Sequence, residues 1–339
     1  MLRWRVHTAT FAKLTAVLER QHLAITLAQI RRAGCDPELT RREVDAGRWQ
    51  RISRGTFLAS ADPPTDLQQA WCAQLAGGEG SVVTGAVACR IAGIADVPSY
   101  LPVAVLVGAN RPRDEDGVHF LRTARPPAPV LRGGLWLAPP ARAVVDAARA
   151  ARSLRDVRAL VTAALRARHC THEELVGELA HSPRRGSGHS RRALQDWADG
   201  ARSAPEAEVA DWLREQVRAR RMPPFLLNPL VYDGSELLGA VDVHVPGCAL
   251  GGEVDSARHH AGVDDLDATL LRHARFAAAG VHLEHVTPTR FRRAPELWAA
   301  GFAMRAADRR RGGDPVRLRI EPAGPVQPVP GRRRRSPNP

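Results

Sequence analysis

Apolar residues that alternate with polar ones predict a pair of strands in the second half of the chain. Three valines in residues 241–245 alternate with Asp242 and a histidine, which predicts a strand with the valines on one face. Residues 249–255 form the next predicted strand after a Pro-Gly turn, and there Glu253 and Asp255 share a face because side chains two apart point the same way. If these two strands pair, Asp242 is expected to lie close to Glu253 and Asp255.

The first 60 residues show two periodicities. Apolar residues three and four apart predict a helix over 9–20, and Thr26 is a suitable N-cap for a short second helix that ends before a glycine. A third helix is expected over 36–46, and residues 49–58 read as a strand, a glycine turn and another strand. Short helices followed by a basic hairpin predict a winged helix-turn-helix.

The middle of the chain is less specific. Residues 61–150 mix helical patterns with a buried strand over 103–107, and they contain no nucleotide-binding glycine pattern. Arg142 and Asp146 lie four apart on a predicted helix, so we expect an ion pair between them. Residues 151–200 are mainly helical and include an exposed basic loop.

These patterns predict a mixed α/β protein of several domains. Its last folded part is expected to be a mixed sheet flanked by helices, and the arginine-, proline- and glycine-rich end is expected to form no core. The predicted parts are a winged helix-turn-helix (1–60), a middle α/β segment (61–150), a helical connector (151–200), the mixed-sheet domain (201–305) and a disordered basic tail (306–339).

The positive charge of the chain is confined to its two ends. Residues 1–60 hold 11 Lys and Arg against five Asp and Glu, and residues 301–339 hold ten against three. The remaining 240 residues are balanced, although the net charge of the whole chain is +13. Charge concentrated in particular segments favours a polyanionic partner, and we expect DNA.

Composition excludes other classes of protein. No run of roughly 18 apolar residues occurs, so no membrane association is expected, and the N-terminus lacks the pattern of an export signal. The five cysteines are scattered and form no Cys-x-x-Cys pair, which favours a reducing, cytoplasmic environment. Those cysteines are Cys35, Cys72, Cys89, Cys170 and Cys248.

The winged helix offers a set of candidate DNA contacts. Thr40 and Arg41 are expected to face a major groove, and the arginines of the wing are expected to meet phosphates. The candidates are Thr40, Arg41, Arg42, Arg48, Arg51 and Arg54. The alternative is a winged helix that docks a protein and keeps a solvated basic face.

This segment resembles the N-terminal domain of AbiEi-type abortive-infection antitoxins. The family pattern Gly-x-x-x-Arg-x-x-x-Gly-x-Tyr/Phe is matched by Gly47, Arg51, Gly55 and Phe57, and the helix over 139–148 resembles a Pro-x-Arg-x-x-x-Asp-x-Ala helix of the same architecture. The resemblance implies DNA binding and leaves open a partner toxin or another protein partner.

The three carboxylates form a candidate metal site. Like charges in apolar surroundings repel one another, and a hard divalent cation with a preference for oxygen ligands relieves that repulsion. Asp242, Glu253 and Asp255 are therefore the candidate ligands for Mg²⁺ or Mn²⁺. The alternative is a solvent-facing sheet edge with ordinary charges.

The same residues carry a second resemblance, over roughly residues 201–300. Glu206, Asp242, the Glu-x-Asp of Glu253 and Asp255, and His259 resemble a domain of unknown function related to very-short-patch-repair endonucleases. That domain belongs to the restriction-endonuclease-like superfamily. The resemblance implies a Mg²⁺-dependent endonuclease with these five as catalytic residues, Glu206 as an auxiliary ligand and His259 as general base.

One departure keeps the function open. Restriction-endonuclease-like nucleases usually place a lysine two residues after the glutamate, where this chain has Asp255, and Lys13 is its only lysine among 49 Lys and Arg residues. A DNA-hydrolysing enzyme is one reading. A non-enzymatic, antitoxin-like DNA-binding regulator with a degenerate nuclease fold is the second, and a protein-interaction module is the third.

Overall fold

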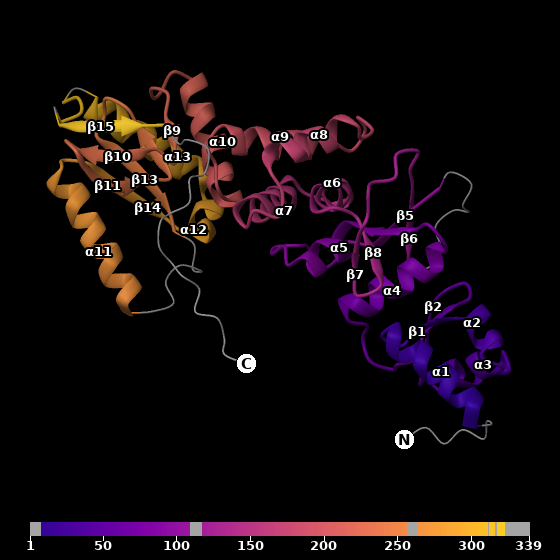
Figure 1. Cartoon of the computed structure of the whole chain (residues 1–339). Helices are drawn as coiled ribbons and strands as arrows, with labels where there is room; N and C mark the ends of the chain where they lie inside the picture. Colours follow the sequence, from indigo (N-terminus) through magenta and orange to yellow (C-terminus); the bar gives the residue numbers. More distant parts are fainter. Residues whose placement is uncertain (1–7, 109–116, 256–262, 311, 316, 323–339) are drawn as a thin grey trace. The chain divides into compact units, whose positions relative to one another are not determined.

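The computed structural model describes residues 8–108, 117–255, 263–310, 312–315 and 317–322 (Figure 1). The chain divides into two compact units, Met1–Leu194 and Gln195–Pro339. Within the described residues there are 13 helices and four sheets, so the prediction of a mixed α/β protein is confirmed at this level.

The first unit begins with three helices and a small sheet. The helices are α1 (Thr8–Arg20), α2 (Leu27–Arg32) and α3 (Glu38–Asp45), and the strands are β1 (Ala24–Thr26), β2 (Gln50–Ser53) and β3 (Thr56–Leu58). The predicted cap is confirmed, because the Thr26 side chain accepts from the backbone of Gln29 in a capping box. The order β1-β3-β2 adds to the predicted hairpin a third strand, β1, which pairs with β3.

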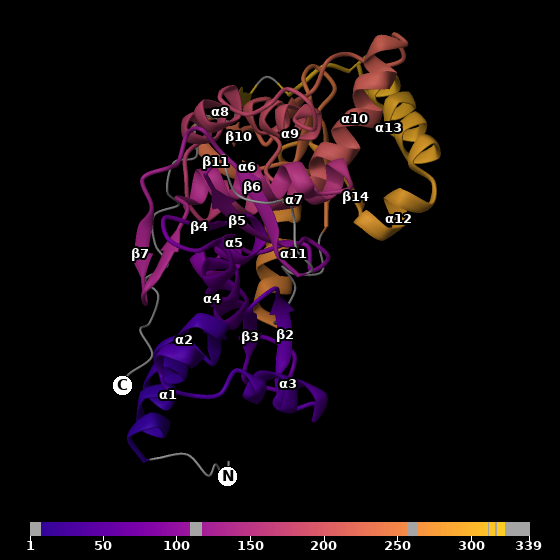
Figure 2. The same ribbon diagram turned by 90° about the vertical axis from the view of Figure 1, so that its right-hand side faces the viewer.

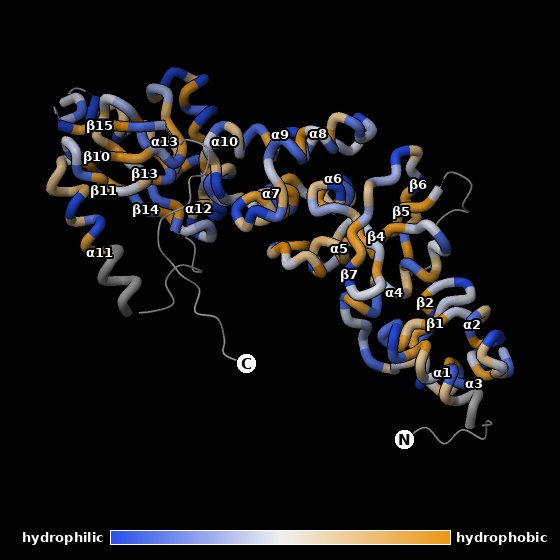
Figure 3. The backbone as a smooth tube through the Cα atoms, in the orientation of Figure 1, coloured by the Kyte–Doolittle hydropathy of each residue, from blue (hydrophilic) through white to orange (hydrophobic). Residues whose placement is uncertain are grey.

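A five-stranded sheet with the order β6-β5-β4-β8-β7 follows. Figure 3 shows the apolar positions of β4 and β5, of which residues 104–107 are buried, and this confirms the predicted strand over 103–107. The predicted ion pair is also confirmed, since Arg142 Nε donates to Asp146 Oδ2 over 2.9 Å. The strands are β4 (Val82–Thr84), β5 (Val103–Val107), β6 (His119–Arg122), β7 (Val130–Arg132) and β8 (Leu135–Leu137).

Six helices accompany this sheet or follow it along the chain. They are α4 (Asp66–Gly77), α5 (Gly85–Ala92), α6 (Pro140–Ala150), α7 (Leu154–Arg166), α8 (His172–Ala180) and α9 (Gly188–Ala198). The predicted turn before α8 is capped as expected, because the Thr171 side chain accepts from Glu174 N. The boundary between the two compact units falls within α9.

The second unit contains a four-stranded and a three-stranded sheet. The four-stranded order is β14-β13-β12-β9, and the three-stranded order is β11-β10-β15. The strands are β9 (Leu226–Leu227), β10 (Leu230–Asp233), β11 (Glu236–Ala240), β12 (Val243–Val245), β13 (Leu250–Val254), β14 (His282–Val286) and β15 (Leu318–Glu321). The helices are α10 (Ala204–Arg218), α11 (Val263–Ala278), α12 (Pro288–Arg293) and α13 (Pro295–Arg309).

Two helices cover one face of the four-stranded sheet. Figure 2 shows α10 and α13 side by side, and both contribute to a core cluster that includes Val243, Val245 and Phe302. Helix α11 connects the parallel strands β13 and β14, as expected because parallel strands need a crossover connection. Phe276 of α11 belongs to a second core cluster with Val241.

Two expectations are corrected here. Val241 does not share a face with Val243 and Val245, because β12 begins only at Val243 and Val241 packs in the other cluster. The chain bends between Val241 and Val243, so Asp242 lies directly before the strand. The prediction that nothing after residue 305 is structured is also wrong, because α13 continues to Arg309 and Leu318–Glu321 pairs with β10. This strand has only two alternating apolar residues among arginines, and that pattern is too weak to predict a strand from the sequence.

Candidate functional site

The carboxylates singled out in the sequence come from three elements of the second unit. Glu206 lies in the first turn of α10, Asp242 directly precedes β12, and Glu253 lies on β13. Because Val243 pairs with Gly252 in the antiparallel β12–β13 ladder, Asp242 lies opposite Glu253. The hairpin therefore brings these two acids together as its sequence predicted.

Asp242 is the electrostatic centre of the group. Its Oδ2 accepts from the backbone N–H of Val254 over 2.7 Å, which fixes the carboxyl at the end of β13. Burial raises the pKa of Asp242 well above its usual value, and the nearby charges of Glu206 and Glu253 raise it further. Three acids from separate elements thus lie close enough together to affect one another's ionisation.

Glu206 is held by the backbone and by an amide. Its side chain is 8% exposed, and its Oε2 accepts from Arg202 N over 2.8 Å and from Asn228 Nδ2 over 2.5 Å. Asn228 N in turn donates to Asp242 O over 3.1 Å. Asn228 follows β9 and joins the two acids, a role that no local motif in the sequence indicated.

Glu253 faces a cation instead of solvent. Arg272 of α11 places Nη2 at 3.1 Å from Glu253 Oε1, which is an ion pair, although that oxygen makes no well-aligned hydrogen bond with any described residue. Burial raises the pKa of Glu253, and the Arg272 guanidinium opposes that rise. Arg272 is a second residue that sequence reasoning missed.

Asp255 binds a histidine that was not among the predicted site residues. Its Oδ2 lies 3.0 Å from His285 Nδ1, and the His285 ring lies 4.4 Å from the ring of His273, centroid to centroid. Burial lowers the pKa of His273, and the neighbouring His285 lowers it further. The parallel register of β13 and β14 sets Glu253 level with His285, and this long-range pairing is what the sequence did not reveal.

The structure therefore groups Glu206, Asp242 and Glu253 and places Asp255 beside His285 at the same end of β13. His259 lies outside the described residues. Among the described residues, no three His, Cys, Asp or Glu side chains are arranged so that they could hold a metal ion as they stand. The donors are hard oxygens of the kind Mg²⁺ takes, and Glu253 Oε1 is left without a hydrogen bond, but Glu206 and Asp255 are directed at protein partners.

The predicted DNA contacts of α3 fall into two groups. Arg41 and Arg42 are exposed, and Arg41 pairs with Glu38. The expectation that Thr40 faces outward is wrong, because it is 6% exposed and its hydroxyl donates to Pro37 O over 2.8 Å. A threonine near a helix start prefers this local bond to solvent.

The predicted contacts of the wing are exposed. Arg51 on β2 and Arg54 in the β2–β3 turn both have exposed side chains. Arg48 donates through Nε and Nη2 to the buried carboxylate of Glu43, both over 2.6 Å, and it remains largely exposed. The wing thus presents three arginines, one of which is oriented by an acid.

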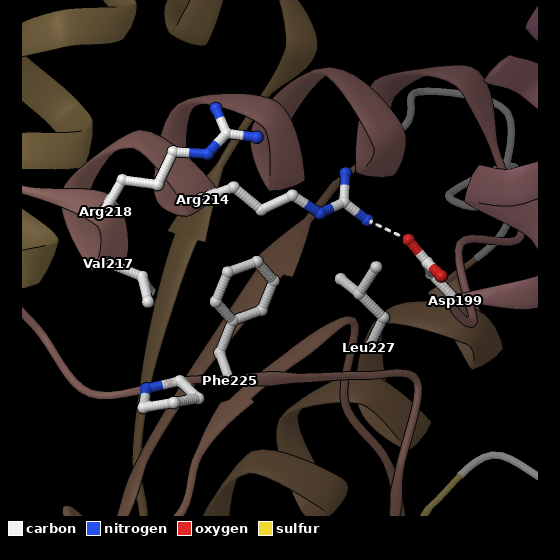
Figure 4. A pocket seen from close by; sticks show the side chains of 7 residues that line it. Asp199, Arg214, Val217, Arg218, Phe225 and Leu227 are labelled. Atoms are coloured by element: carbon white, nitrogen blue, oxygen red, sulfur yellow. Dashed lines mark hydrogen bonds and ion pairs between the residues drawn. The ribbon is translucent and has the colours of Figure 1, made fainter.

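A cavity of about 470 Å³ lies beside α10 in the second unit (Figure 4). Its lining residues are Asp199, Arg214, Val217, Arg218, Pro224, Phe225 and Leu227. Arg214 lies 2.9 Å from Asp199, 3.1 Å from Asp211 and 3.3 Å from Asp196. Because three acids balance that guanidinium, we read this wall as an ion-pair network that fixes α10 against the end of α9.

Comparison with known proteins assigns no family. No protein-family model matches the chain, and no curated protein sequence matches it. Among solved structures, the Rv2827c protein from Mycobacterium tuberculosis is similar over 57% of this chain and 78% of its own, at 18% identity and a TM-score of 0.36. A similarity at that level assigns no function. No helix in the described parts of the chain combines the length and apolar character needed to cross a bilayer.

Proposed function

We propose that this chain is a DNA-binding protein whose C-terminal unit is a Mg²⁺-dependent endonuclease. The winged helix binds the duplex, and the acids at the end of β13 form the hydrolytic site. In this reading the C-terminal unit is a restriction-endonuclease-like domain, similar to that of very-short-patch-repair endonucleases, and the N-terminal domain is AbiEi-antitoxin-like.

The observation that carries the proposal is the grouping of three acids. Asp242 lies opposite Glu253 in the β12–β13 hairpin, and Asn228 bonds both Glu206 and the backbone of Asp242. Burial raises the pKa of Asp242, and the two neighbouring carboxylates raise it further, so this group of acids is costly to the fold. Perturbed acids of this kind concentrate at functional sites. The apolar cluster that packs on β12 and β13 contains none of these acids. A bound divalent cation offsets the repulsion between the carboxylates, and the carboxylates then contribute to the affinity for the cation.

We assign the roles of the residues from their chemistry and, where the structure describes them, from their contacts. Asp242, Glu253 and Asp255 are the proposed ligands of Mg²⁺ or Mn²⁺, with Glu206 as an auxiliary ligand. When bound, the cation supplies charge stabilisation for the phosphorane-like transition state. Arg272, which pairs with Glu253, is proposed to stabilise the same negative charge. His259 is the proposed base that takes the proton of the attacking water, and His285 orients Asp255.

DNA binding is expected to depend on the exposed arginines of the first unit. Arg51→Gln combined with Arg54→Gln removes two proposed phosphate contacts of the wing, so affinity for duplex DNA falls and the salt slope flattens by about one per lost contact. Fluorescence anisotropy over a salt series measures both. Arg166→Gln, an exposed arginine of α7, is the matched control. An unchanged slope in the double variant contradicts the winged-helix assignment.

The basic tail gives a second arm to this measurement. Removing residues 323–339 is expected to weaken binding and flatten the salt slope without altering sequence preference, because phosphate contacts carry no sequence information. A change in sequence preference after this deletion counts against a purely electrostatic tail.

Metal binding is expected to raise the melting temperature. A ligand that binds only the native state stabilises it by about 2.7 kcal/mol at one hundred times its Kd. Mg²⁺ or Mn²⁺ should therefore shift the thermal transition of the wild-type chain, and Asp242→Asn with Glu253→Gln should remove the shift. Differential scanning calorimetry with and without the cation measures it. A shift that persists in the double variant places the metal elsewhere.

One observation favours a second function. Arg272 already supplies a positive charge to Glu253, which is what a retired nuclease site needs in order to keep its acids without a cation. In that case the chain is a non-enzymatic, antitoxin-like DNA-binding regulator. Arg272→Gln separates the two functions, because it destabilises a regulator that relies on the ion pair and leaves metal-dependent stabilisation intact in a nuclease.

A further inference from the structure

A second cavity, of about 440 Å³, lies within the first unit and has a strongly basic lining. It is bounded by β5, β6, the start of α5, α6 and the segment after α8, and Figure 2 shows α5, α6, β5 and β6 side by side. Its charged lining consists of four arginines and a single acid, Asp146. The arginines are Arg122, Arg125, Arg142 and Arg149. This excess of cations points to an anionic ligand.

The inner wall of the cavity is a fixed polar group. Thr84 Oγ1 donates to Asp146 Oδ2 over 2.7 Å, and Arg142 Nε donates to the same oxygen over 2.9 Å. Thr84 is fully buried, and the side chains of Arg142 and Asp146 are 12% and 9% exposed. Burial raises the pKa of Asp146, and Arg142 opposes that rise. A preset donor and acceptor pair of this kind fixes the orientation of a ligand.

The start of α5 adds backbone donors. Thr84 is the N-cap, but its hydroxyl is used on Asp146, so no side chain caps the first turn. Gly85 and Ala86 line the cavity, and Gly85 forms an isolated antiparallel bridge with Val103. The first N–H groups of a helix have no partner within the helix, which leaves the first turn of α5 as the source of donors. Gly85 has a φ of +65°, and an added Cβ would meet Ala104 Cβ at 3.4 Å. The turn therefore favours glycine and keeps the backbone close to the cavity.

The other three arginines of the lining do not pair with an acid of the cavity. The guanidinium of the exposed Arg122 has no hydrogen bond or ion pair with any described residue, and Arg149 donates to Pro183 O over 3.4 Å. Arg125 pairs with Glu178, which does not line the cavity. Arginine binds phosphate oxygens through two parallel N–H groups, and a helix start favours the same anion.

Apart from the charged residues, the lining has a polar part and an apolar wall. The polar part consists of His119, Thr123, His181 and Ser182. The apolar wall includes Leu101, Pro102, Ala104, Leu121 and Ala147. Such a wall suits a flat ring, and the volume lies within the usual range for small-molecule sites. We propose that this cavity binds a mononucleotide, with its phosphate at Arg122, Arg149 and the start of α5 and its base against the apolar wall. No glycine-rich loop is needed, because arginine side chains supply most of the donors.

Isothermal titration of the full-length chain with adenosine monophosphate tests this site. Binding is expected with the monophosphate and is expected to be weaker with adenosine or inorganic phosphate alone, since each lacks half of the contacts. Arg122→Gln should weaken binding about tenfold, the usual size of one lost charge-assisted hydrogen bond. Arg166→Gln has the same charge change on an exposed part of α7 and should bind like wild type.

A second variant separates shape from charge. Ala124 is exposed and lines the cavity, so Ala124→Trp fills part of it without altering any charge, and binding should again fall. Unchanged affinity in both Arg122→Gln and Ala124→Trp overturns the proposal. Inorganic phosphate that binds as tightly as the monophosphate also overturns it, as does a 5′-phosphorylated oligonucleotide that binds more tightly and loses affinity in the same two variants, since the occupant is then a DNA end.

Discussion

Asp242→Asn combined with Glu253→Gln is expected to reduce Mg²⁺-dependent DNA cleavage by roughly a thousandfold or more. The two acids lie opposite each other on the β12–β13 hairpin and belong to the proposed metal site. Charge stabilisation by a bound metal contributes several kcal/mol to the transition state, and each 1.4 kcal/mol is about a factor of ten in rate. Neutral amides of the same shape retain the fold while removing the charge.

Nicking of supercoiled plasmid, with single-stranded and mismatched oligonucleotides in parallel, measures this rate in Mg²⁺ and in Mn²⁺. Glu215→Gln is the matched control, because Glu215 is an exposed acid on the same helix as Glu206. Its rate should equal that of the wild type. A wild-type chain that cleaves none of these substrates in either metal supports the antitoxin-like regulator instead.

The same assay compares the two histidines. His259→Ala should lose roughly two to four decades of rate if His259 is the general base. The wild-type rate should then decrease as the pH is lowered, because a protonated imidazole cannot accept a proton. His285→Ala should cost less, because His285 contacts Asp255 and acts through it. A larger loss in His285→Ala than in His259→Ala transfers the role of base to the histidine on β14.

Local patterns predicted much of the secondary structure. The helix expected over 9–20 corresponds to α1, and the apolar run at 103–107 is β5, because both depend on periodicity within one segment. The hairpin register followed from the same source, so Asp242 and Glu253 meet as expected. Short-range spacing and turn chemistry are enough for such contacts.

Contacts between distant segments could not be read in this way. His285 and Arg272 reach the acids only because β14 pairs in parallel with β13 and α11 packs beside them, 19 to 32 positions further along the chain. β15 joins β10 from 89 positions away. Thr40 shows a different limit of prediction from local patterns. Its hydroxyl bonds to a nearby backbone oxygen, so the side chain is buried instead of exposed.

Phe302→Ala is expected to lower the free energy of unfolding of the second unit by about 3–5 kcal/mol, the usual range for a buried phenylalanine. Phe302 is fully buried, and its ring stacks on Trp298 with a centroid distance of 5.1 Å. A methyl group at Gly252 would lie 3.3 Å from the ring, so Phe302 packs directly on β13. The cavity left by alanine therefore lies behind the strand that carries Glu253.

Urea unfolding of the full-length chain, followed by tryptophan fluorescence, measures this loss. Met304→Ala is the control, because Met304 is on the same helix and is 61% exposed, so its change should stay within about 0.5 kcal/mol. Coincident transitions in the two variants contradict the packing described here. Since a domain is stable by only about 5–15 kcal/mol, the loss in Phe302→Ala is a large share of the total. The cation-induced shift in melting temperature should therefore shrink with it, because the acids on β13 are held in place by this core.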